Sequence, residues 1–360
     1  MTVQKLSTAL FFFLASCVHG PLAPSVEHRF SDGFWSGFSS SVVEYSRLST
    51  DGEMLSFGTN GGRLYAVSPR DGSMRWSRKL LGSIDTQTGF GAGHIFVGTS
   101  KGRFYALREA DGQEDWHYDV PGVIIGRPAQ LGNTVLFGAD DAAVYALDSG
   151  SGQLRWKYRR DIPDRMTVHD FAAIYGASDV AYVAFSDGTV AALKLSSGEP
   201  VWVKSLPAQE RFSDVTTLLL LEENQLLAGQ FDGALYSLNR NGEIEWIFPH
   251  GGSAAPPLLF KNELVVPMPG NRIAMLDPKS GTKKWEFDAK DTARWGGVTT
   301  FGSYLLASSY EGNLFVLDPA KGELKWKYNF GAPIQGGPIV MDEKAWVLTR
   351  KGRLFSMRVR

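Results

Sequence analysis

Residues 146–156 read ALDSGSGQLRW, and related stretches end at six other tryptophans of this 360-residue chain. They are AVSPRDGSMRW (66–76), ALREADGQEDW (106–116), ALKLSSGEPVW (192–202), SLNRNGEIEW (237–246), MLDPKSGTKKW (275–285) and VLDPAKGELKW (316–326). In all seven stretches a Gly stands four residues before the Trp. The chain is therefore an array of repeats, and the repeat decides its architecture.

The spacing of the tryptophans sets the length of the repeat. Eight of the ten form one series, with successive gaps of 41, 40, 40, 46, 44, 39 and 41 residues. Its members are Trp35, Trp76, Trp116, Trp156, Trp202, Trp246, Trp285 and Trp326. Between the Gly-rich turns, β-branched and aromatic residues alternate with period two, which is typical of strands joined by tight hairpins. Each unit is therefore predicted to be one four-stranded antiparallel blade of an all-β propeller.

The last unit predicts how the ring closes. After Trp326 the chain supplies three more strands and ends at Arg360 without another Trp of the series. We expect the N-terminal segment around Trp35 to supply the missing outer strand, which closes eight blades and removes open sheet edges. Seven blades is the alternative, because Ser31 stands where Gly is expected. Each Trp is interpreted as a wedge between blades that offers its indole N–H to a backbone carbonyl.

The N-terminus has the features of a secretory signal. Lys5 precedes an apolar run, Leu6 to Ala15, that is too short to span a bilayer. The run ends in LASC, which resembles the bacterial lipobox, and Cys17 is the only cysteine of the chain. We predict a lipoprotein signal peptide over 1–16, a lipidated N-terminus and flexible tether over 17–29, and one propeller domain over 30–360. Val18 after the cysteine implies, by resemblance, sorting to the outer membrane.

The composition argues against several kinds of function. A net charge of −1 with 21% charged residues excludes nucleic-acid binding through a dominant basic surface. A single Cys cannot form an intrachain disulfide or a cysteine-based metal site. The six His show no ligand spacing. Residues 98–102, GTSKG, match G-x-S-x-G only on a predicted strand-to-strand hairpin, where a nucleophile does not belong. We therefore expect no enzyme activity, no cofactor and no metal.

The block A-x-D-x-x-x-G-x-x-x-W resembles the tryptophan-docking motif of two families of eight-bladed propellers. These are the quinoprotein dehydrogenases and the BamB family of outer-membrane assembly lipoproteins. In its lipobox, its length and its number of repeats, the chain is similar to members of the BamB family. The resemblance implies a non-catalytic scaffold of the β-barrel assembly machinery, anchored in the outer membrane and facing the periplasm. Its implied partners are the periplasmic domains of the insertase BamA and unfolded outer-membrane proteins.

Two segments carry a more specific resemblance. The longest repeat gaps place extra residues at about 157–170 and 203–214, and insertions in repeat proteins map to loops. The first contains a D-x-P loop and the second an R-x-S-D-V segment, both similar to loops by which BamB-family proteins bind BamA. The resemblance assigns this contact to Asp161, Pro163, Arg165, Met166, Val168, His169, Arg211, Ser213, Asp214 and Val215. Thr216 stands where the family has a second acidic residue.

Other functions remain open on the residues alone. The two segments can also be read as surface loops without a partner. A propeller that binds a ligand or signal in its central channel is a second class of function. A quinoprotein dehydrogenase is a third, but those enzymes stack their cofactor on a disulfide between adjacent cysteines. The lone Cys17 cannot form that disulfide.

Overall fold

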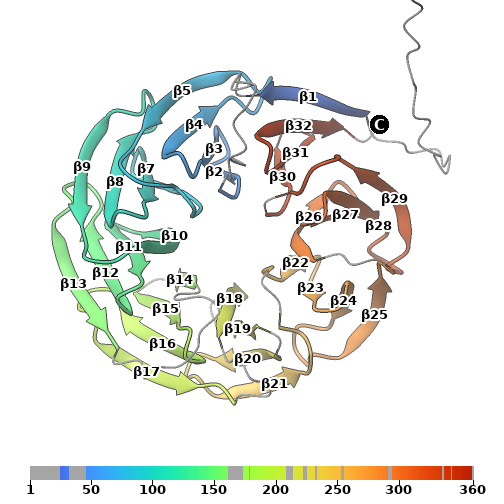
Figure 1. Cartoon of the computed structure of the whole chain (residues 1–360). Helices are drawn as coiled ribbons and strands as arrows, with labels where there is room; N and C mark the ends of the chain where they lie inside the picture. The colour runs from blue at the N-terminus through green and yellow to red at the C-terminus, as the bar shows by residue number, and fades with distance from the viewer. Residues whose placement is uncertain are drawn as a thin grey trace, which may run out of the picture.

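The computed structural model shows a ring of eight four-stranded sheets (Figure 1). It describes residues 25–31, 46–160, 173–177, 179–207, 214–221, 225–231, 233–252, 255–290, 294–334, 336–341 and 343–358. Within these ranges every helix or strand element is a β-strand, and neighbouring strands of a blade run antiparallel. The predicted all-β, eight-bladed propeller is confirmed, and the chain does not form seven blades.

The blades follow one another along the chain, each built from its innermost to its outermost strand. Blade 1 is β2–β5 (Ser49–Thr50, Leu55–Gly58, Arg63–Val67, Met74–Lys79), blade 2 is β6–β9 (Gly89–Gly91, His94–Gly98, Arg103–Arg108, Glu114–Asp119), blade 3 is β10–β13 (Ile124–Leu131, Thr134–Ala139, Ala143–Asp148, Leu154–Arg159) and blade 4 is β14–β17 (Ala173–Ala177, Val180–Ala184, Thr189–Lys194, Pro200–Ser205). Blade 5 is β18–β21 (Val215–Leu221, Gln225–Gln230, Leu235–Asn239, Ile244–Phe248), blade 6 is β22–β25 (Leu258–Phe260, Glu263–Met268, Arg272–Leu276, Lys283–Asp288) and blade 7 is β26–β29 (Trp295–Phe301, Tyr304–Ser309, Asn313–Leu317, Leu324–Asn329). Blade 8 joins β30–β32 (Ile339–Met341, Lys344–Leu348, Arg353–Arg358) to β1 (Ser25–Ser31).

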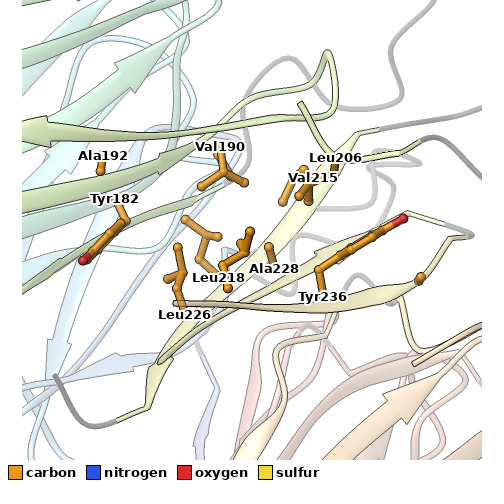
Figure 2. Packing of buried hydrophobic residues seen from close by; sticks show 12 residues of the cluster. Tyr182, Val190, Ala192, Leu206, Val215, Leu218, Leu226, Ala228 and Tyr236 are labelled. Atoms are coloured by element: carbon orange, nitrogen blue, oxygen red, sulfur yellow. The ribbon is translucent and has the colours of Figure 1, made fainter. Parts of the chain in front are cut away.

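The hydrophobic core lies between neighbouring blades. The second and third strands of a blade are apolar on both faces, so that nearly every residue of β11 and β12 is buried. The outer strand β9 alternates between exposed and half-buried residues instead. Figure 2 shows the layer between blades 4 and 5, where Tyr182 and Ala192 of blade 4 lie in one cluster with Leu226 and Tyr236 of blade 5. The burial of such apolar layers is the main favourable term in folding.

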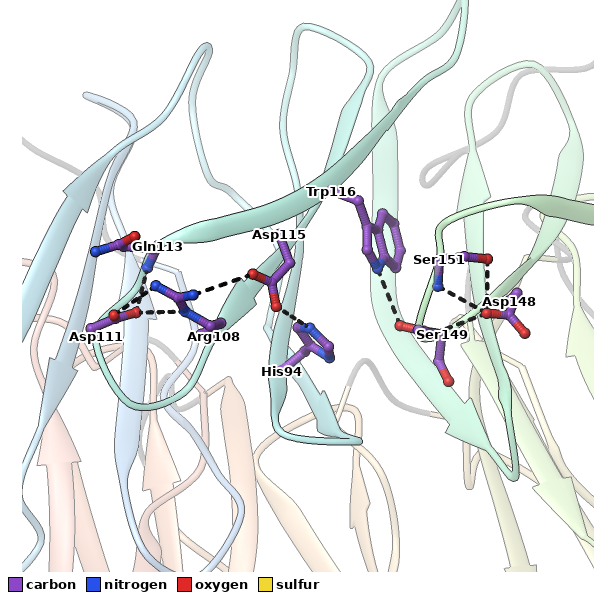
Figure 3. Close-up of polar contacts among 10 residues, drawn as sticks. His94, Arg108, Asp111, Gln113, Asp115, Trp116, Asp148, Ser149 and Ser151 are labelled. Atoms are coloured by element: carbon purple, nitrogen blue, oxygen red, sulfur yellow. Dashed lines mark hydrogen bonds and ion pairs between the residues drawn. The ribbon is translucent and has the colours of Figure 1, made fainter.

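A Trp on the outer strand ties most blades to the next one. Trp156 on β13 packs over Gly198, and its Nε1–H donates a hydrogen bond to the Leu195 carbonyl at 2.7 Å. Figure 3 shows the same contact one blade earlier, from Trp116 to the Ser149 carbonyl at 3.2 Å. The other such bonds run from Trp76 to Glu109, Trp202 to Arg240, Trp246 to Pro278 and Trp285 to Pro319. The wedge role therefore rests on one repeated contact.

The repeated Gly is required at its position for steric reasons. A Cβ built on Gly198 would lie 2.5 Å from the ring of Trp156, and the φ of Gly198 is +73°. Both the left-handed backbone and the ring above it exclude a side chain. In several blades a carboxylate earlier in the same turn caps it. The example in blade 3 is Asp148. Asp148 Oδ1 accepts the backbone N–H groups of Gly150 and Ser151 at 3.1 and 2.9 Å (Figure 3).

The ring closes by an N-terminal strand, as expected, but the strand lies earlier in the chain. β1 pairs with β32, with Val26 opposite Met357 and Glu27 opposite Ser356. In blade 1 the fourth residue of the third strand, Ala66, pairs with the docking Trp76. The fourth residue of β32 is Ser356, so Glu27 holds the position of the docking Trp in blade 8.

The Trp spacing pointed to the wrong place for the closing strand because it assumed that blade 8 keeps the Trp of the other blades. Trp35 lies outside the described residues, so its wedge role stays a prediction. The same is true of Cys17 and the signal peptide. The boundary expected between tether and domain at 29/30 falls inside β1, so residues 25–29 belong to the sheet rather than to a tether.

Candidate partner-binding surface

The start of the first long segment and both ends of the second contact one turn of blade 4. This turn, 185–188, joins β15 to β16 and contains Phe185, Asp187 and Gly188. The segment 161–172 connects blade 3 to blade 4, and the segment 208–213 connects blade 4 to blade 5; both lie outside the described residues. The described residues at their ends show where each is attached.

Arg160 holds the start of the first segment. Its Nη2 lies 3.0 Å from Asp187 Oδ2, and the exposed fractions of the two side chains are only 21% and 9%. Its guanidinium carbon lies 5.4 Å from the centre of the Phe185 ring, and its backbone N–H donates to the Ala142 carbonyl at 3.2 Å. A half-buried ion pair stacked on an aromatic face fixes an arginine more firmly than an exposed pair.

The second segment is attached at both ends. The Leu206 N–H donates to the Gly188 carbonyl at 2.9 Å, and the Tyr236 hydroxyl donates to the Pro207 carbonyl at 2.6 Å. On the far side, the Val215 N–H donates to the Phe185 carbonyl at 3.3 Å. Leu206 and Val215 are both buried in the layer between blades 4 and 5 (Figure 2). The described residue before the first segment and those on both sides of the second therefore contact the same turn.

Asp214 and Val215 are the predicted partner contacts whose side chains the structure describes, and of the two Asp214 carries the charge. It is only 1% exposed, and its carbonyl accepts the Phe231 N–H at 2.8 Å. A carboxylate this deeply buried supports the end of the segment from inside the fold. The other predicted contacts lie outside the described residues: Asp161, Pro163, Arg165, Met166, Val168, His169, Arg211 and Ser213.

The outermost strand of blade 4 differs from those of its neighbours. β17 exposes Val201 by 53% and Val203 by 45%, on either side of Trp202. The residue before the docking Trp is charged in six other blades: Arg75, Asp115, Arg155, Glu245, Lys284 and Lys325. β17 is the last strand of its sheet, and edge strands are commonly protected from further pairing by charged side chains. Blade 4 thus presents an outer edge on which two exposed valines flank the Trp, with Pro200 and Lys204 on the same strand.

Sequence reasoning missed Arg160, Phe185 and Asp187. The pair Asp187-Gly188 has the composition of a hairpin turn, and Gly188 belongs to the repeated turn glycines. Nothing in the repeat, however, shows that this turn faces the ends of two inter-blade segments. That information comes from the placement of blades 3, 4 and 5 around the ring. Val201 on β17 could be recognised from the sequence, since aligning the seven Trp blocks puts Val where the other blocks carry a charged residue.

Ionisable side chains outside this surface form local pairs. His94 Nε2 lies 2.8 Å from Asp115 (Figure 3), and His117 Nδ1 lies 2.7 Å from Glu114. Among the described residues, no group of three or more His, Cys, Asp or Glu side chains is placed to hold a metal ion. The described part of the chain contains no helix that is long and apolar enough to cross a membrane.

Relatives of known name share parts of the sequence. Outer membrane protein assembly factor BamB from Kangiella koreensis is 28% identical over 205 residues, which cover 54% of this chain and 52% of the relative. The protein of that name from Xanthomonas campestris pv. campestris is 27% identical over 202 residues, covering 54% and 50%. The chain spans about half the length of the curated relatives it matches.

Solved structures share the fold over nearly the whole chain. The crystal structure of BamB from Moraxella catarrhalis has a TM-score of 0.77 at 16% identity, covering 94% of this chain and 98% of that one. A europium-containing methanol dehydrogenase has a TM-score of 0.72 at 14% identity, covering 90% of this chain and 84% of that one. At these identities the structures bear on the fold alone.

The family follows from the sequence match. The family model described as outer membrane protein assembly factor BamB matches residues 60–267 and 269–359, which takes in most of the ring from blade 1 to blade 8. The match agrees with the resemblance drawn from the Trp blocks and the lipobox. The chain belongs to the BamB family of outer membrane protein assembly factors.

Proposed function

We propose that this chain is a non-catalytic scaffold of the outer-membrane β-barrel assembly machinery. In this proposal a lipid on Cys17 anchors it in the outer membrane, and the propeller faces the periplasm. The segments 161–172 and 208–213, with Asp214 supporting the second, bind the periplasmic domains of a BamA-like insertase. Unfolded outer-membrane proteins are its further partners. Membership of the BamB family supports each of these assignments.

The observation that carries the proposal is the attachment of both segments to the turn 185–188. A partner that contacts two loops at once needs them at a fixed separation, because a loop that must be ordered on binding weakens the complex. Arg160 holds the start of the first segment, and the hydrogen bonds of Leu206 and Val215 hold both ends of the second, before any partner arrives. Blade 4 therefore provides a preorganised base for two contact loops.

A scaffold role also agrees with the residues available for chemistry. The quinoprotein dehydrogenases of the same fold, by the resemblance given above, need a disulfide between adjacent cysteines. This chain has one Cys, and the proposal uses its thiol for the lipid. Two or three acyl chains give stable anchoring, where one chain gives only marginal membrane binding.

Purification from detergent-solubilised membranes tests the partner. The parent chain is expected to bring down the BamA homologue of the host. Arg165→Glu and Arg211→Glu should each reduce its recovery by about tenfold or more, because a reversed charge repels the group that the arginine contacts. Lys194→Glu is the matched control, since Lys194 lies on β16 of the same blade, is exposed, and faces Glu199 at 3.0 Å. It should leave recovery unchanged.

Two outcomes would contradict different parts of the proposal. If the parent chain recovers no BamA homologue, the partner is wrong. If Arg165→Glu and Arg211→Glu recover as much as Lys194→Glu does, the partner stands and the two segments are not its site. Asp214→Arg is a poor test, because Asp214 is buried and the change would disturb folding.

The anchor is tested separately. Cys17→Ala should abolish incorporation of labelled palmitate and move the protein from the membrane fraction to the soluble fraction of the periplasm. Cys17→Ser removes the same thiol with almost no change in size and should behave identically. Label retained in either variant would show that the lipid is attached elsewhere.

A further inference from the structure

The eight innermost strands of the ring carry a single charged residue. They surround the ring axis in Figure 1. Their sequences are ST (β2), GFG (β6), IIGRPAQL (β10), AIYGA (β14), VTTLLLL (β18), LLF (β22), WGGVTTF (β26) and IVM (β30). The charge is that of Arg127 on β10. Within the strands that the structure describes, the inner wall is otherwise built from apolar, small and hydroxyl-bearing residues.

A β-bulge sets Arg127 apart from the sheet. The ladder between β10 and β11 pairs Ile125 with Gly138 and resumes only at Ala129, which pairs with Leu136. Gly126 has a φ of +79°, a conformation that favours glycine, and Pro128 has no backbone N–H to give to a ladder. Bulges of this kind redirect a side chain and occur often next to binding sites. The backbone of β10 therefore presents Arg127 outside the regular pairing.

The described surroundings of Arg127 hold no ion pair with it. Its side chain is exposed to solvent, and no carboxylate among the described residues pairs with it. Even so, the surrounding protein removes enough water to lower the pKa of the guanidinium. Tyr175 lies on β14, the innermost strand of the next blade, with its side chain 40% exposed, and its charge interaction acts to raise the pKa of Arg127. The geometry therefore leaves an exposed guanidinium on the innermost strand β10, paired with no carboxylate among the described residues and available to a bound anion.

We propose that Arg127 and Tyr175 form a binding site for an oxyanion group, a carboxylate or a phosphate, at the axis of the ring. The guanidinium presents a planar set of N–H donors that matches two oxygens of such a group. The Tyr175 hydroxyl is the further donor from the neighbouring blade. The apolar strands around the two residues suit a ligand whose other parts are apolar or small. This site lies on the innermost strands β10 and β14, whereas the partner surface is built on the turn 185–188.

Two probes distinguish the sources of such a group. One is inorganic phosphate; the other is a short uncharged peptide with a free C-terminal carboxylate, compared with the same peptide amidated. Binding is measured by calorimetry and by the shift in melting temperature, because a ligand of the folded state raises it. The parent is expected to bind phosphate, the free-carboxylate peptide or both, and not the amidated peptide. Binding should weaken as salt is raised.

The variants locate the site. Arg127→Gln should weaken the bound probe by about tenfold or more, because it removes a charge-assisted hydrogen bond, and Tyr175→Phe should weaken it less. Arg103→Gln is the control, since Arg103 on β8 is already paired with Asp119 at 2.6 Å. Without ligand, Arg127→Gln should melt at the same temperature as the parent or higher, since no ion pair is lost.

Several results would overturn the proposal. If neither probe binds to the parent chain, the proposal is overturned without any variant being needed. Equal binding by Arg127→Gln would place the site elsewhere, and equal binding of the amidated peptide would show that the oxyanion is not what is recognised. If Arg127→Gln fails to fold, Arg127→Lys keeps a positive charge and should retain most of the binding. Loss of folding in both variants would make Arg127 a structural residue instead.

Discussion

The repeated contact between a Trp and a Gly of the next blade is the smallest unit that holds this ring together. Trp156 is only 7% exposed, and its indole fills the space above Gly198 while its N–H meets a carbonyl of the same turn. Both residues were visible in the sequence as a fixed spacing. The acceptor Leu195 was not, because the bond is to backbone and joins two blades.

At the scale of this contact, Gly198→Ala is expected to lower the free energy of unfolding by about 2–5 kcal/mol. The left-handed backbone alone costs Ala about 1–2 kcal/mol, and the clash of its Cβ with the Trp156 ring adds about 1–3 kcal/mol. Gly132→Ala is the matched control, because Gly132 has a φ of +56° with nothing within 4 Å of an added Cβ. Gly132→Ala should lower the free energy of unfolding only by the cost of the left-handed backbone. Urea unfolding of the two variants measures the difference.

A double-mutant cycle identifies the clash. In a Trp156→Ala background, Gly198→Ala should cost no more than Gly132→Ala does, because the ring that it strikes is gone. If the extra destabilisation persists without the ring, the backbone of the turn is responsible and the wedge interpretation of this Gly fails.

The turn carboxylates predict an acid-sensitive part of the stability. A backbone N–H of Ser73 and side-chain contacts lower the pKa of Asp71 to about 2, and Arg155 with Ser151 lowers the pKa of Asp148 to about 2. The pKa values of Asp277 and Asp318 are lowered by backbone N–H groups of their own turns. Because folding lowers these values, their stabilisation is complete above the ordinary pKa of 3.8 and is lost as pH falls toward about 2.

Replacement of these four aspartates by Asn should flatten the pH dependence of the urea midpoint over that window. The turns should survive, because Asn239 already caps the turn of blade 5 through its Oδ1, which accepts the Asn241 and Glu243 N–H groups at 2.9 and 3.0 Å. The midpoint of parent and variant is compared from pH 5 downward. A variant that keeps the full slope of the parent would show that other groups cause the acid sensitivity.

At the scale of the strand, six outer strands carry a charged residue before the docking Trp, and β17 carries Val201 there instead. Alternation, turns and Trp spacing predicted the existence and order of the four strands in each blade. They did not predict the closing strand, since β1 lacks the Trp that marks the others and holds Glu27 in its place. They also did not predict that the ends of two inter-blade segments meet on the turn 185–188, because contacts between blades leave no periodic signal in one blade.

The edge of β17 is expected to accept an extended apolar strand, as unfolded outer-membrane proteins would offer. Val201→Lys combined with Val203→Glu should weaken binding of a labelled β-strand peptide from such a protein by about three- to tenfold, measured by fluorescence anisotropy. Both side chains are exposed, so stability should change by no more than about 0.5 kcal/mol.

A gain-of-function control lies on blade 7. Lys325 and Lys327 flank Trp326 on β29 as the two valines flank Trp202 on β17. Replacing both lysines with Val should create a second apolar edge and raise binding of the same peptide. If neither pair of changes alters binding, strand addition at the outer edges is not how the chain holds unfolded substrates.

At the scale of the whole molecule, the ring depends on one strand from the other end of the chain. Six residues of β1 pair with β32, and Val26 packs against the cluster that contains Phe330, Val347 and Met357. A chain that starts at residue 32 should therefore lose roughly 3–6 kcal/mol of stability, at about 1 kcal/mol for each lost backbone pairing. A chain that starts at residue 25 keeps β1 and should unfold at the urea concentration of the mature protein. Equal midpoints for the two chains would show that β1 is dispensable.

The position of β1 also dictates the order in which the ring can be completed. β1 is the first strand to be synthesised and β32 the last, so Val26 must wait for Met357 before blade 8 exists. Until then the other seven blades form an open arc with an unpaired strand at its start. Contacts of such long sequence separation form slowly. At high chain concentration, β1 of one molecule can meet β32 of another and give a domain-swapped dimer in which each ring is closed by its neighbour.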